Sequence, residues 1–508
     1  MRIFSRLGSI SAIALTLAAP QALADIKGPD VWAAYVAYYE ATGAQVIGTP
    51  ETAGGVTEVV DPTLLYRFPF GFATIRVVLP TVTFTDQSDG TVAMSYPATF
   101  DVTVEADVPD QGSGTGIFTV TQDNYVGSAA GDPDAVVISY AADGLQLGLK
   151  ELTFPDSDDL SFQGQILSEG YGGTSTIAIG EDFVTVTGDT VARPADLAYV
   201  MEFPSGDLMT QTGEYGQAAY QTEMSLPKGG TSLFALSKAL TDGAFVRVTS
   251  QIDSNSSNAV TTIGGQVLSD QTTNTGSSVT EFSVSADGLH VASEVGESSF
   301  DVLMPDMIPV PIEGVLAAAT ATYTFPLLPR DTAQNIVLKL GLTDLTLSED
   351  LWAMFDPAAE MPRDPASLNI DIIGSVVSEI DWLDFANLEA QLDQPVPPIT
   401  PEEITINDLS ISAVGASAQG SGAFTLDLTD LETFDGFPRP EGAANLAVSG
   451  ANALLDRLTN LGLIGPDEAG MARLGMGFIA RSTGADSFET AVEVNAEGQV
   501  FVNGQRMR

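Results

Sequence analysis

The sequence predicts a mainly β fold, in which large, curved and mostly antiparallel sheets carry a few peripheral helices in an elongated or two-domain chain. The clearest sign is the stretch FDVTVEADV, where Phe100, Val102 and Val104 alternate with Asp101 and Thr103, as in a strand that buries one face. Similar alternation recurs along the chain between Asp-Gly and Gly-rich turns. The 508 residues also exceed the roughly 250–300 at which a single core stops growing.

Residues 1–24 are predicted to be a cleaved export signal. Arg2 and Arg6 precede an apolar run over residues 7–19, and an Ala-x-Ala end closes at Ala24, after which we expect cleavage. The run is shorter than the roughly 18 residues that a membrane-spanning helix needs, so a membrane anchor is the weaker interpretation. We therefore expect a periplasmic chain that has no transmembrane span once the signal is removed.

The charge balance excludes nucleic acid as a partner. The chain has 19 basic and 67 acidic residues and a net charge of -48, whereas polyanions are bound by clustered Lys and Arg. With 44% hydrophobic residues the chain can still bury a core, unlike a disordered acidic tail. Its lack of cysteine rules out disulfides, thiolate catalysis and cysteine metal sites.

The first element after the signal is predicted to be an amphipathic helix. In GPDVWAAYVAYYEATG, apolar residues recur at helical spacing behind Asp30 as a cap, and Gly43 ends the helix. Its aromatic stripe is more typical of a face packed on a sheet than of a ligand platform. Strands dominate from Val46 onward. Four further helices are predicted at residues 232–240, 348–355, 449–461 and 467–481.

The chain divides into a predicted N-terminal β-rich region, residues 25–320, and a C-terminal region of sheet and helices, residues 321–508. The Pro-rich stretch at residues 304–314 is interpreted as the connection between the two regions. A second Pro-rich stretch, at residues 393–403, is interpreted as a long loop.

Two further patterns concern the strands. The chain ends in a predicted hairpin, with alternation at Val492 and Val494 and again at Val500 and Val502, before a turn at Asn503. An apolar-x-acidic-Leu-hydroxyl-apolar unit recurs at unequal intervals, so it does not indicate a regular solenoid. Its copies are residues 149–154, 342–347 and 406–411. The likeness between ISYAADGL and FSVSADGL fits either related sheet units or chance.

No catalytic, cofactor or metal residue is predicted. The single histidine, His290, makes a site of several imidazoles impossible, and no nucleophile motif accompanies it as a Ser-His-acid triad would require. The sequence also lacks phosphate-binding loops, dinucleotide fingerprints and calcium repeats. The densest acidic cluster, formed by Asp156, Asp158 and Asp159, is more typical of a solvated loop than of a calcium or catalytic site.

Several stretches of the C-terminal part carry a family resemblance. They are LTLSEDLWAMFDP with MPRDPASL, FDGFPRPEG, the helix around LLDRLTNLGLI and the closing EVNAEGQVFVNGQRMR, and the early Asp30-Val31-Trp32 fits as well. Through them the chain from about Tyr323 to Arg508 resembles an uncharacterised exported bacterial family, domain of unknown function 2125. The resemblance implies an envelope protein with no assigned activity, and it supplies no catalytic residue.

Arg363, Arg439 and Trp352 are the candidate contacts for a ligand or an anion. Both arginines lie in proline-flanked turns, and Trp352 lies in a helix that we expect to be pinned to a sheet. The alternative is that each arginine is paired within the protein and partly buried.

These observations favour a non-catalytic protein that binds a lipid or another apolar ligand on a curved β-sheet. The alternative is a structural or assembly factor of the cell envelope that acts through protein contacts at sheet edges. A hydrolase that uses paired carboxylates is the third and weakest hypothesis.

Overall fold

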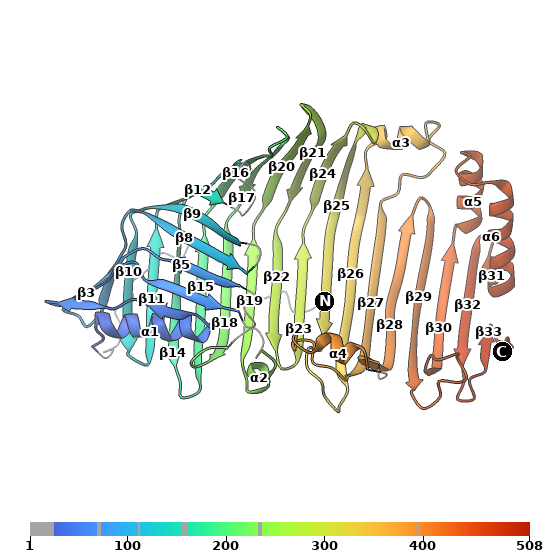
Figure 1. Cartoon of the computed structure of the whole chain (residues 1–508). Coiled ribbons are helices and arrows are strands. Elements are labelled where there is room, and N and C mark those ends of the chain that lie inside the picture. The colour runs from blue at the N-terminus through green and yellow to red at the C-terminus, as the bar shows by residue number, and fades with distance from the viewer. Residues whose placement is uncertain (1–24, 69–72, 110–111, 154–160, 232–235, 395–396) are drawn as a thin grey trace.

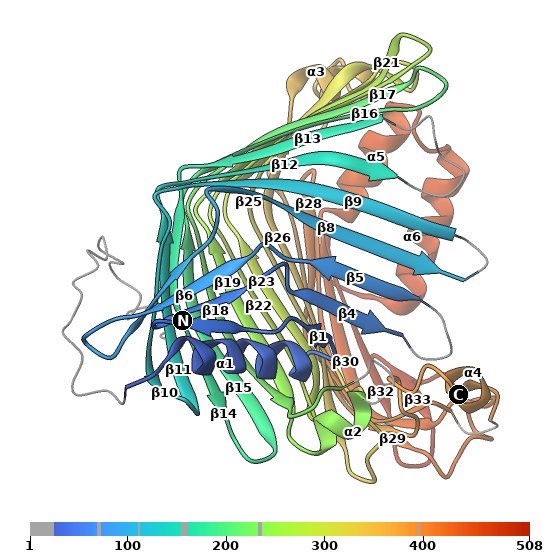
Figure 2. The same cartoon turned by 60° about the vertical axis from the view of Figure 1, so that its left-hand side comes forward.

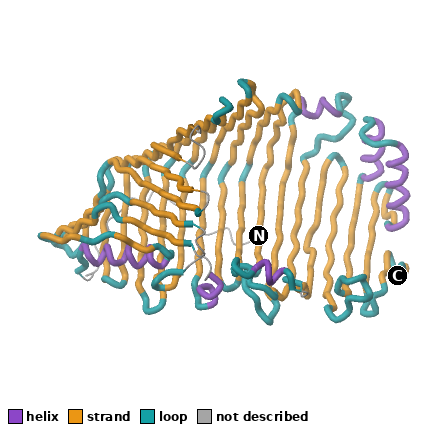
Figure 3. Tube along the Cα trace, in the orientation of Figure 1, coloured by secondary structure: helices purple, strands orange, loops and turns teal. Residues whose placement is uncertain are grey.

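The computed structural model describes residues 25–68, 73–109, 112–153, 161–231, 236–394 and 397–508. The predicted export signal and the acidic cluster at Asp156, Asp158 and Asp159 lie outside these residues. Strand accounts for 60% of the chain and helix for 12%, which confirms the mainly β fold class. The strands join into one open antiparallel sheet that makes up most of the body (Figures 1 and 3).

From β1 to β24 the sheet is creased into two limbs that meet at an angle (Figure 2). Each pair of consecutive strands, beginning with β1 and β2, forms one bent strand with a half in each limb. The first limb consists of β1 (Gln45–Ile47), β4 (Thr63–Arg67), β5 (Thr74–Val78), β8 (Thr99–Val108), β9 (Gly112–Asp123), β12 (Gly144–Thr153), β13 (Ser161–Ser168), β16 (Ala195–Glu202), β17 (Leu208–Tyr215), β20 (Asn255–Ile263), β21 (Gln266–Thr275) and β24 (Ser298–Met304). The second limb consists of β2 (Glu51–Ala53), β3 (Val56–Val59), β6 (Val82–Asp86), β7 (Val92–Ser95), β10 (Val126–Asp132), β11 (Ala135–Ala142), β14 (Tyr171–Ile179), β15 (Phe183–Ala192), β18 (Ala218–Pro227), β19 (Phe245–Ile252), β22 (Ser278–Ser285) and β23 (Gly288–Val295).

The crease is a corner in each bent strand and not a break in hydrogen bonding. At the corner between β17 and β18 the Gly216 N–H donates to the Ser254 carbonyl at 2.8 Å, so pairing continues through the bend. Residues three apart across this corner, Tyr215 and Ala218, lie on the same side of the sheet. Such a change of alternation is that of a β-bulge, which bends a strand.

The crease ends at β25, which runs unbroken through both limbs. Its first half pairs with β24, where Ile312 lies opposite Val302, and its second half pairs with β23, where Tyr323 lies opposite Val291. One broad sheet continues from there to the C-terminus (Figure 1). Its strands are β25 (Ile308–Phe325), β26 (Gln334–Leu347), β27 (Ala366–Ser378), β28 (Ile399–Ala413), β29 (Ala416–Asp427), β30 (Arg439–Ser449), β31 (Arg481–Gly484), β32 (Ser487–Val494), β33 (Val500–Val502) and β34 (Gln505–Arg506).

This continuity corrects the interpretation of residues 304–314 as a connection between regions. They form the turn between β24 and β25 and the start of β25. Pro309 and Pro311 are accommodated because the β24–β25 register shifts beside them, and prolines enter strands at such irregular or edge positions. The predicted boundary after residue 320 falls inside β25, so the residues on either side of it share one sheet. The Pro-rich stretch at residues 393–403 runs into β28 at its C-terminal end.

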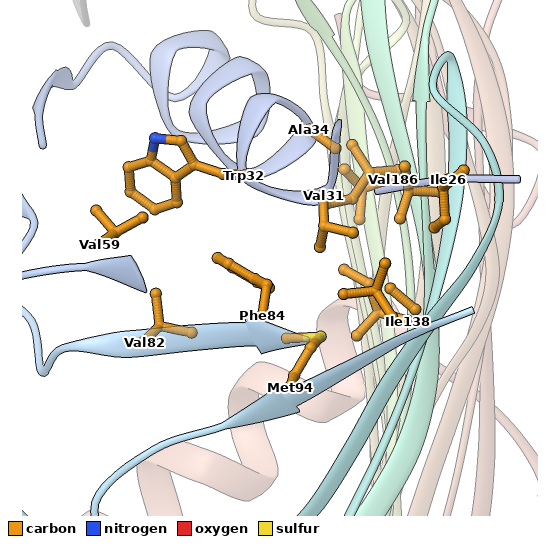
Figure 4. Packing of buried hydrophobic residues seen from close by; sticks show 14 of the residues in the cluster. Ile26, Val31, Trp32, Ala34, Val59, Val82, Phe84, Met94, Ile138 and Val186 are labelled. Carbon is orange, nitrogen blue, oxygen red and sulfur yellow. The ribbon is translucent and has the colours of Figure 1, made fainter. Parts of the chain in front are cut away.

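The helix α1 (Gly28–Ala41) confirms the first predicted helix. It begins two residues before Asp30, whose carboxylate accepts the Lys27 N–H at 2.9 Å and so satisfies a donor of the first turn. Its apolar side packs on the second limb, in a core that includes Trp32 and Phe84 (Figure 4). The aromatic stripe therefore packs on a sheet, as predicted.

The other helices follow or precede strands at the ends of the sheet. Ser348 begins α3, where its hydroxyl oxygen accepts the Leu351 N–H. The four predicted helices are confirmed, apart from residues 232–235, which lie outside the described part of the chain. The short helix α4 was missed because five residues carry no readable helical period. The helices are α2 (Leu236–Thr241), α3 (Glu349–Phe355), α4 (Leu388–Leu392), α5 (Ala451–Asn460) and α6 (Pro466–Ile479).

The predicted terminal hairpin is also confirmed. In β32 and β33, Val492 lies opposite Val502 and Val494 lies opposite Val500. Asn503 then has a φ of 49° and Gly504 a φ of 78°, as a two-residue hairpin turn requires.

Candidate ligand-binding face

One side of the creased sheet faces inward at the bend. The Tyr171 hydroxyl in the second limb donates a hydrogen bond to Gln122 Oε1 in the first limb at 3.0 Å, so these side chains point toward each other. Directly opposed residues of an antiparallel pair lie on the same face, and the strand registers therefore carry this assignment across the whole sheet. We call the side that contains Tyr171 and Gln122 the inner face, and the other side the outer face.

The inner face carries a continuous apolar row from the second limb to the C-terminal strands. A single row of directly opposed residues crosses it from β19 to β33, and every member is aliphatic, aromatic or glycine. We call it the apolar row. In order across the sheet it consists of Val248, Phe282, Val291, Tyr323, Leu338, Ile372, Ile406, Gly422, Ala444, Val492 and Val502.

Charged side chains are almost absent from the inner face. Among the paired strand residues that the structure describes, the one charged residue there is Asp86, whose carboxylate accepts the Gly28 N–H at the start of α1 at 2.9 Å. The ion pairs between strands lie on the outer face, as Lys339 and Asp371 do at 3.1 Å. The chain has 67 acidic residues, yet this segregation leaves the inner face almost free of charged side chains.

The exposure of the inner face increases along the chain. Near α1 its side chains are buried, with Phe84 0% and Ile138 3% exposed. On the later strands Tyr323 is 42%, Leu338 49% and Leu409 43% exposed. Contiguous apolar surface of this kind is uncommon on a soluble monomer and is typical of surfaces that contact a protein, a membrane or a ligand.

The recurring apolar-x-acidic-Leu unit keeps the inner face apolar at irregular points of the sheet. In β26 a register shift puts Leu342 and Leu345 on the same face although they lie three residues apart, and Asp344 between them has a φ of 54°. The same shift separates Ile406 and Leu409 in β28, and the copy in β12 shifts as well. The unit therefore marks β-bulges that hold two apolar side chains on the inner face.

Eight tyrosines gather where α1 meets both limbs. The rings of Tyr38 and Tyr39 lie 5.2 Å apart between centroids, and those of Tyr96 and Tyr125 lie 5.4 Å apart. Burial raises the pKa of Tyr96 to about 12 and raises the pKa of Tyr39 as well. We call this group the tyrosine cluster. It consists of Tyr35, Tyr38, Tyr39, Tyr66, Tyr96, Tyr125, Tyr140 and Tyr171.

Two of the three predicted contact residues lie together beside α3. The Arg363 guanidinium carbon lies 4.4 Å from the centre of the Trp352 ring, and its Nη1 donates to the buried Asp356 carboxylate at 2.6 Å. Burial alone would raise the pKa of Asp356, but hydrogen bonds from the Met361 N–H, from Arg363 and from the Glu360 N–H outweigh burial and lower the pKa. Arg363 therefore fixes the turn that follows α3.

Arg439 is held in a second internal network. It forms ion pairs with Asp427 at 2.5 Å and with Asp430 at 3.1 Å, and it donates to the Ala496 carbonyl. Arg439 begins β30, which the registers align with the start of β26, whereas α3 follows the end of β26. The structure thus leaves Arg439 apart from the other two residues, and contact of the three with a ligand stays a prediction.

The other polar features lie away from the inner face. His290 lies on the outer face, where its Nδ1 is 2.9 Å from Thr324 Oγ1. A pocket of 590 Å³ opens on the outer face between polar side chains such as Gln419 and Asn445. No group of three His, Asp or Glu side chains in the described part of the chain is arranged to hold a metal ion. Among the same residues, no helix has the length and apolar character needed to cross a membrane.

Comparison with known proteins identifies a family for the C-terminal half of the chain. The model of the family DUF2125, described as an uncharacterised protein conserved in bacteria, matches residues 249–507, about half of the chain. The match confirms the resemblance predicted from about Tyr323 onward and extends it toward the N-terminus, to the last residues of β19. No curated protein matches the chain.

Proposed function

The chain belongs to the DUF2125 family, whose description assigns no activity, and we propose from its geometry that it binds the acyl chains of a lipid on the inner face without catalysing a reaction. In this proposal the protein acts in the periplasm, after removal of the predicted export signal. The observation that supports it is the apolar row from Val248 to Val502, which is uncharged and partly exposed.

The exposed part of the inner face has the size for more than one acyl chain. Neighbouring strands lie about 4.8 Å apart, so the strands from β19 to β33 extend over roughly 50 Å. Covering a half-exposed leucine such as Leu338 recovers about 1 kcal/mol, because full burial of its side chain is worth roughly 1.5–3 kcal/mol. Several such side chains together give an acyl chain a favourable binding energy.

The charges favour acyl chains over a charged ligand. The described strand residues of the inner face include no Lys or Arg that could pair with a phosphate or carboxylate. A net charge of -48 also disfavours anions in general. The apolar row therefore suits the hydrocarbon part of a lipid, while a polar headgroup stays in water beyond the row.

The first test is to identify what copurifies with the protein. Residues 25–508 are purified from the periplasm of a bacterial host and extracted with organic solvent, and the lipids are identified by mass spectrometry beside an unrelated secreted protein. We expect one or more lipids in stoichiometric amount. An extract no richer than that of the control protein would overturn the proposal and would favour a structural or assembly role through protein contacts.

Matched variants on the two faces test where the lipid lies. Leu338→Asp and Leu409→Asp each place a carboxylate on the inner face at a half-exposed position, where the charge can reach water in the free protein. Ile373→Asp is the control, because Ile373 is 38% exposed but lies on the outer face next to Ile372. We expect the two inner variants to hold about one tenth of the lipid that the wild type holds, because a bound acyl chain would bury the new carboxylate. The control should hold as much lipid as the wild type. Equal retention in all three variants would contradict binding at the inner face.

A further inference from the structure

The inner face differs at its two ends, and the difference bears on how a ligand lies there. Resting on the proposed function, we propose that the tyrosine cluster is the closed end of the lipid-binding surface, so that acyl chains lie on β17 and later strands and enter and leave over the C-terminal part of the sheet. The protein is then a carrier with one open end and not a conduit that passes lipid along its whole length.

The tyrosine cluster lies at the bend between the limbs, at the end of the sheet on which α1 packs. Its members come from α1, from both limbs and from the corners between them, as Tyr39, Tyr66 and Tyr125 do. The Thr42 hydroxyl at the end of α1 lies 3.2 Å from the Tyr66 hydroxyl in β4 of the first limb. The Tyr171 hydroxyl reaches Gln122 across the bend at 3.0 Å. Through these contacts the cluster bridges both limbs and α1.

The cluster is also partly buried. None of its eight members is among the exposed side chains, and burial raises the pKa of Tyr35, Tyr39 and Tyr125. The Tyr35 ring contacts Phe84, with centroids 6.4 Å apart, and so continues the core that α1 forms with the second limb. An acyl chain could enter this region only by displacing packed aromatic rings, which costs the contacts of each ring.

The pattern of exposed side chains changes directly after the cluster. In the described strands from β1 to β15, the exposed large apolar side chains all lie on the outer face. They are Ile47, Val56, Val126, Val137 and Leu167. From β17 onward the inner face itself carries exposed side chains, beginning with Met209 at 37% and Tyr220 at 38%. The surface available to a ligand therefore begins next to the cluster and runs toward the C-terminus.

Photocrosslinking shows where the methyl end of a bound acyl chain lies. The mature protein, residues 25–508, is incubated with a long-chain fatty acid that carries a diazirine near its terminal methyl group, irradiated, digested and analysed by mass spectrometry. We expect adducts at inner-face residues of β17 and later strands, such as Phe282, Tyr323 and Leu338, and none in the cluster. Adducts on Tyr39 or Tyr96 in the wild-type protein would show that acyl chains reach the tyrosine cluster, and would overturn the proposal that the cluster is a closed end.

Variants of the tyrosine cluster test directly whether its rings block the acyl chain. In Tyr39→Ala with Tyr96→Ala the rings are removed, and we expect new adducts on inner-face residues of the first limb, such as Phe100 and Val102. Tyr39→Phe with Tyr96→Phe keeps the rings, so its adducts should match those of the wild type. If the alanine variant does not fold, the wild-type map still decides, because it alone reports whether the cluster is reached.

The outcomes separate this inference from the proposed function. No adduct anywhere on the inner face overturns the proposed function, and the closed end with it. Adducts spread evenly from β8 to β33, with the cluster included, leave lipid binding in place and overturn only the closed end. Adducts confined to β17 and later strands support both.

Discussion

Tyr171 and Gln122 are joined by a 3.0 Å hydrogen bond that crosses the bend between β14 and β9. These strands belong to different limbs and do not pair with each other. Backbone hydrogen bonds run within each limb and through the corners. This contact between side chains adds a further tie across the bend, next to the tyrosine cluster.

Removal of this hydrogen bond has a measurable cost. In Tyr171→Phe the ring remains, but Gln122 Oε1 loses its donor, so we expect the free energy of unfolding to fall by about 1 kcal/mol. Chemical denaturation of variant and wild type measures the difference. Tyr220→Phe serves as control, because Tyr220 is 38% exposed and its substitution should change stability by less than about 0.5 kcal/mol. Equal losses in the two variants would contradict the role of the bond.

The bulge at Asp344 makes a prediction about backbone conformation. Its φ of 54° suits Asp or Gly, whereas a β-branched residue is strained there. We expect Asp344→Val to destabilise the protein by about 1–2 kcal/mol and Asp344→Gly to have little effect. Denaturation midpoints compare the two variants. A valine variant as stable as the glycine variant would show that the bulge does not hold this conformation in solution.

The buried Asp356 makes the stability of the α3 region depend on pH. Its pKa is lowered in the folded protein, so its carboxylate contributes stability above the ordinary pKa of about 4, and this contribution is lost as the pH falls through the lowered pKa. We expect Asp356→Asn to melt lower at neutral pH and to lose less stability in acid than the wild type. Melting temperatures of variant and wild type over a range of pH test this expectation. If the two melting temperatures fell in parallel as the pH is lowered, the expectation would be wrong.

The helix α6 can be stabilised by a single methyl group. A Cβ at Gly475 would meet no other atom within 4 Å, and Gly in a helix interior costs roughly 0.5–1 kcal/mol relative to Ala. We expect Gly475→Ala to slow hydrogen exchange in α6 by a matching amount. Gly450→Ala is the contrasting variant, since Gly450 has a φ of 73° and its added Cβ would clash with the Gly415 carbonyl oxygen. A gain in Gly450→Ala equal to that in Gly475→Ala would refute the argument.

Local patterns in the sequence predicted the local structure. The alternation of Phe100, Val102 and Val104 identifies β8 and the face it buries, because side-chain direction in a strand depends only on parity. Helix caps and the two-residue turn at Asn503 are equally local, since their hydrogen bonds close within a few residues. These features needed no knowledge of distant partners.

The crease could not be predicted in this way. The short segments at its corners, such as Gly216-Gln217 and Asp253-Ser254, look like hairpin turns, but there the chain passes into the other limb. The similar stretches ISYAADGL and FSVSADGL show the same ambiguity. Asp143 of the first lies at a corner of the crease, whereas Asp287 of the second lies in the hairpin turn between β22 and β23. Which of the two forms depends on strand partners far away in the sequence.

For the candidate site, too, the general feature could be predicted from the sequence, whereas its individual residues could not. An apolar face on a curved sheet was expected, but its members depend on registers and bulges, and Leu342 and Leu345 share a face only because of a register shift. Arg363 and Arg439 were predicted as ligand contacts because they lie in proline-flanked turns, yet their partners, including Asp356 and Asp427, lie within the protein. The sequence indicates the turn and does not show which carboxylate pairs with the arginine.

The strands of this sheet stand side by side in nearly the order in which the chain is made. Each bent strand pairs only with the one before it and the one after it, from β1 to β24, and the pattern continues through β30. Assembly can therefore proceed as in repeat proteins, by adding one hairpin after another to an existing edge. Since α1 packs on the earliest strands, it gives this growth a starting core. The length of such a molecule can change by whole hairpins while the strands already paired stay as they are.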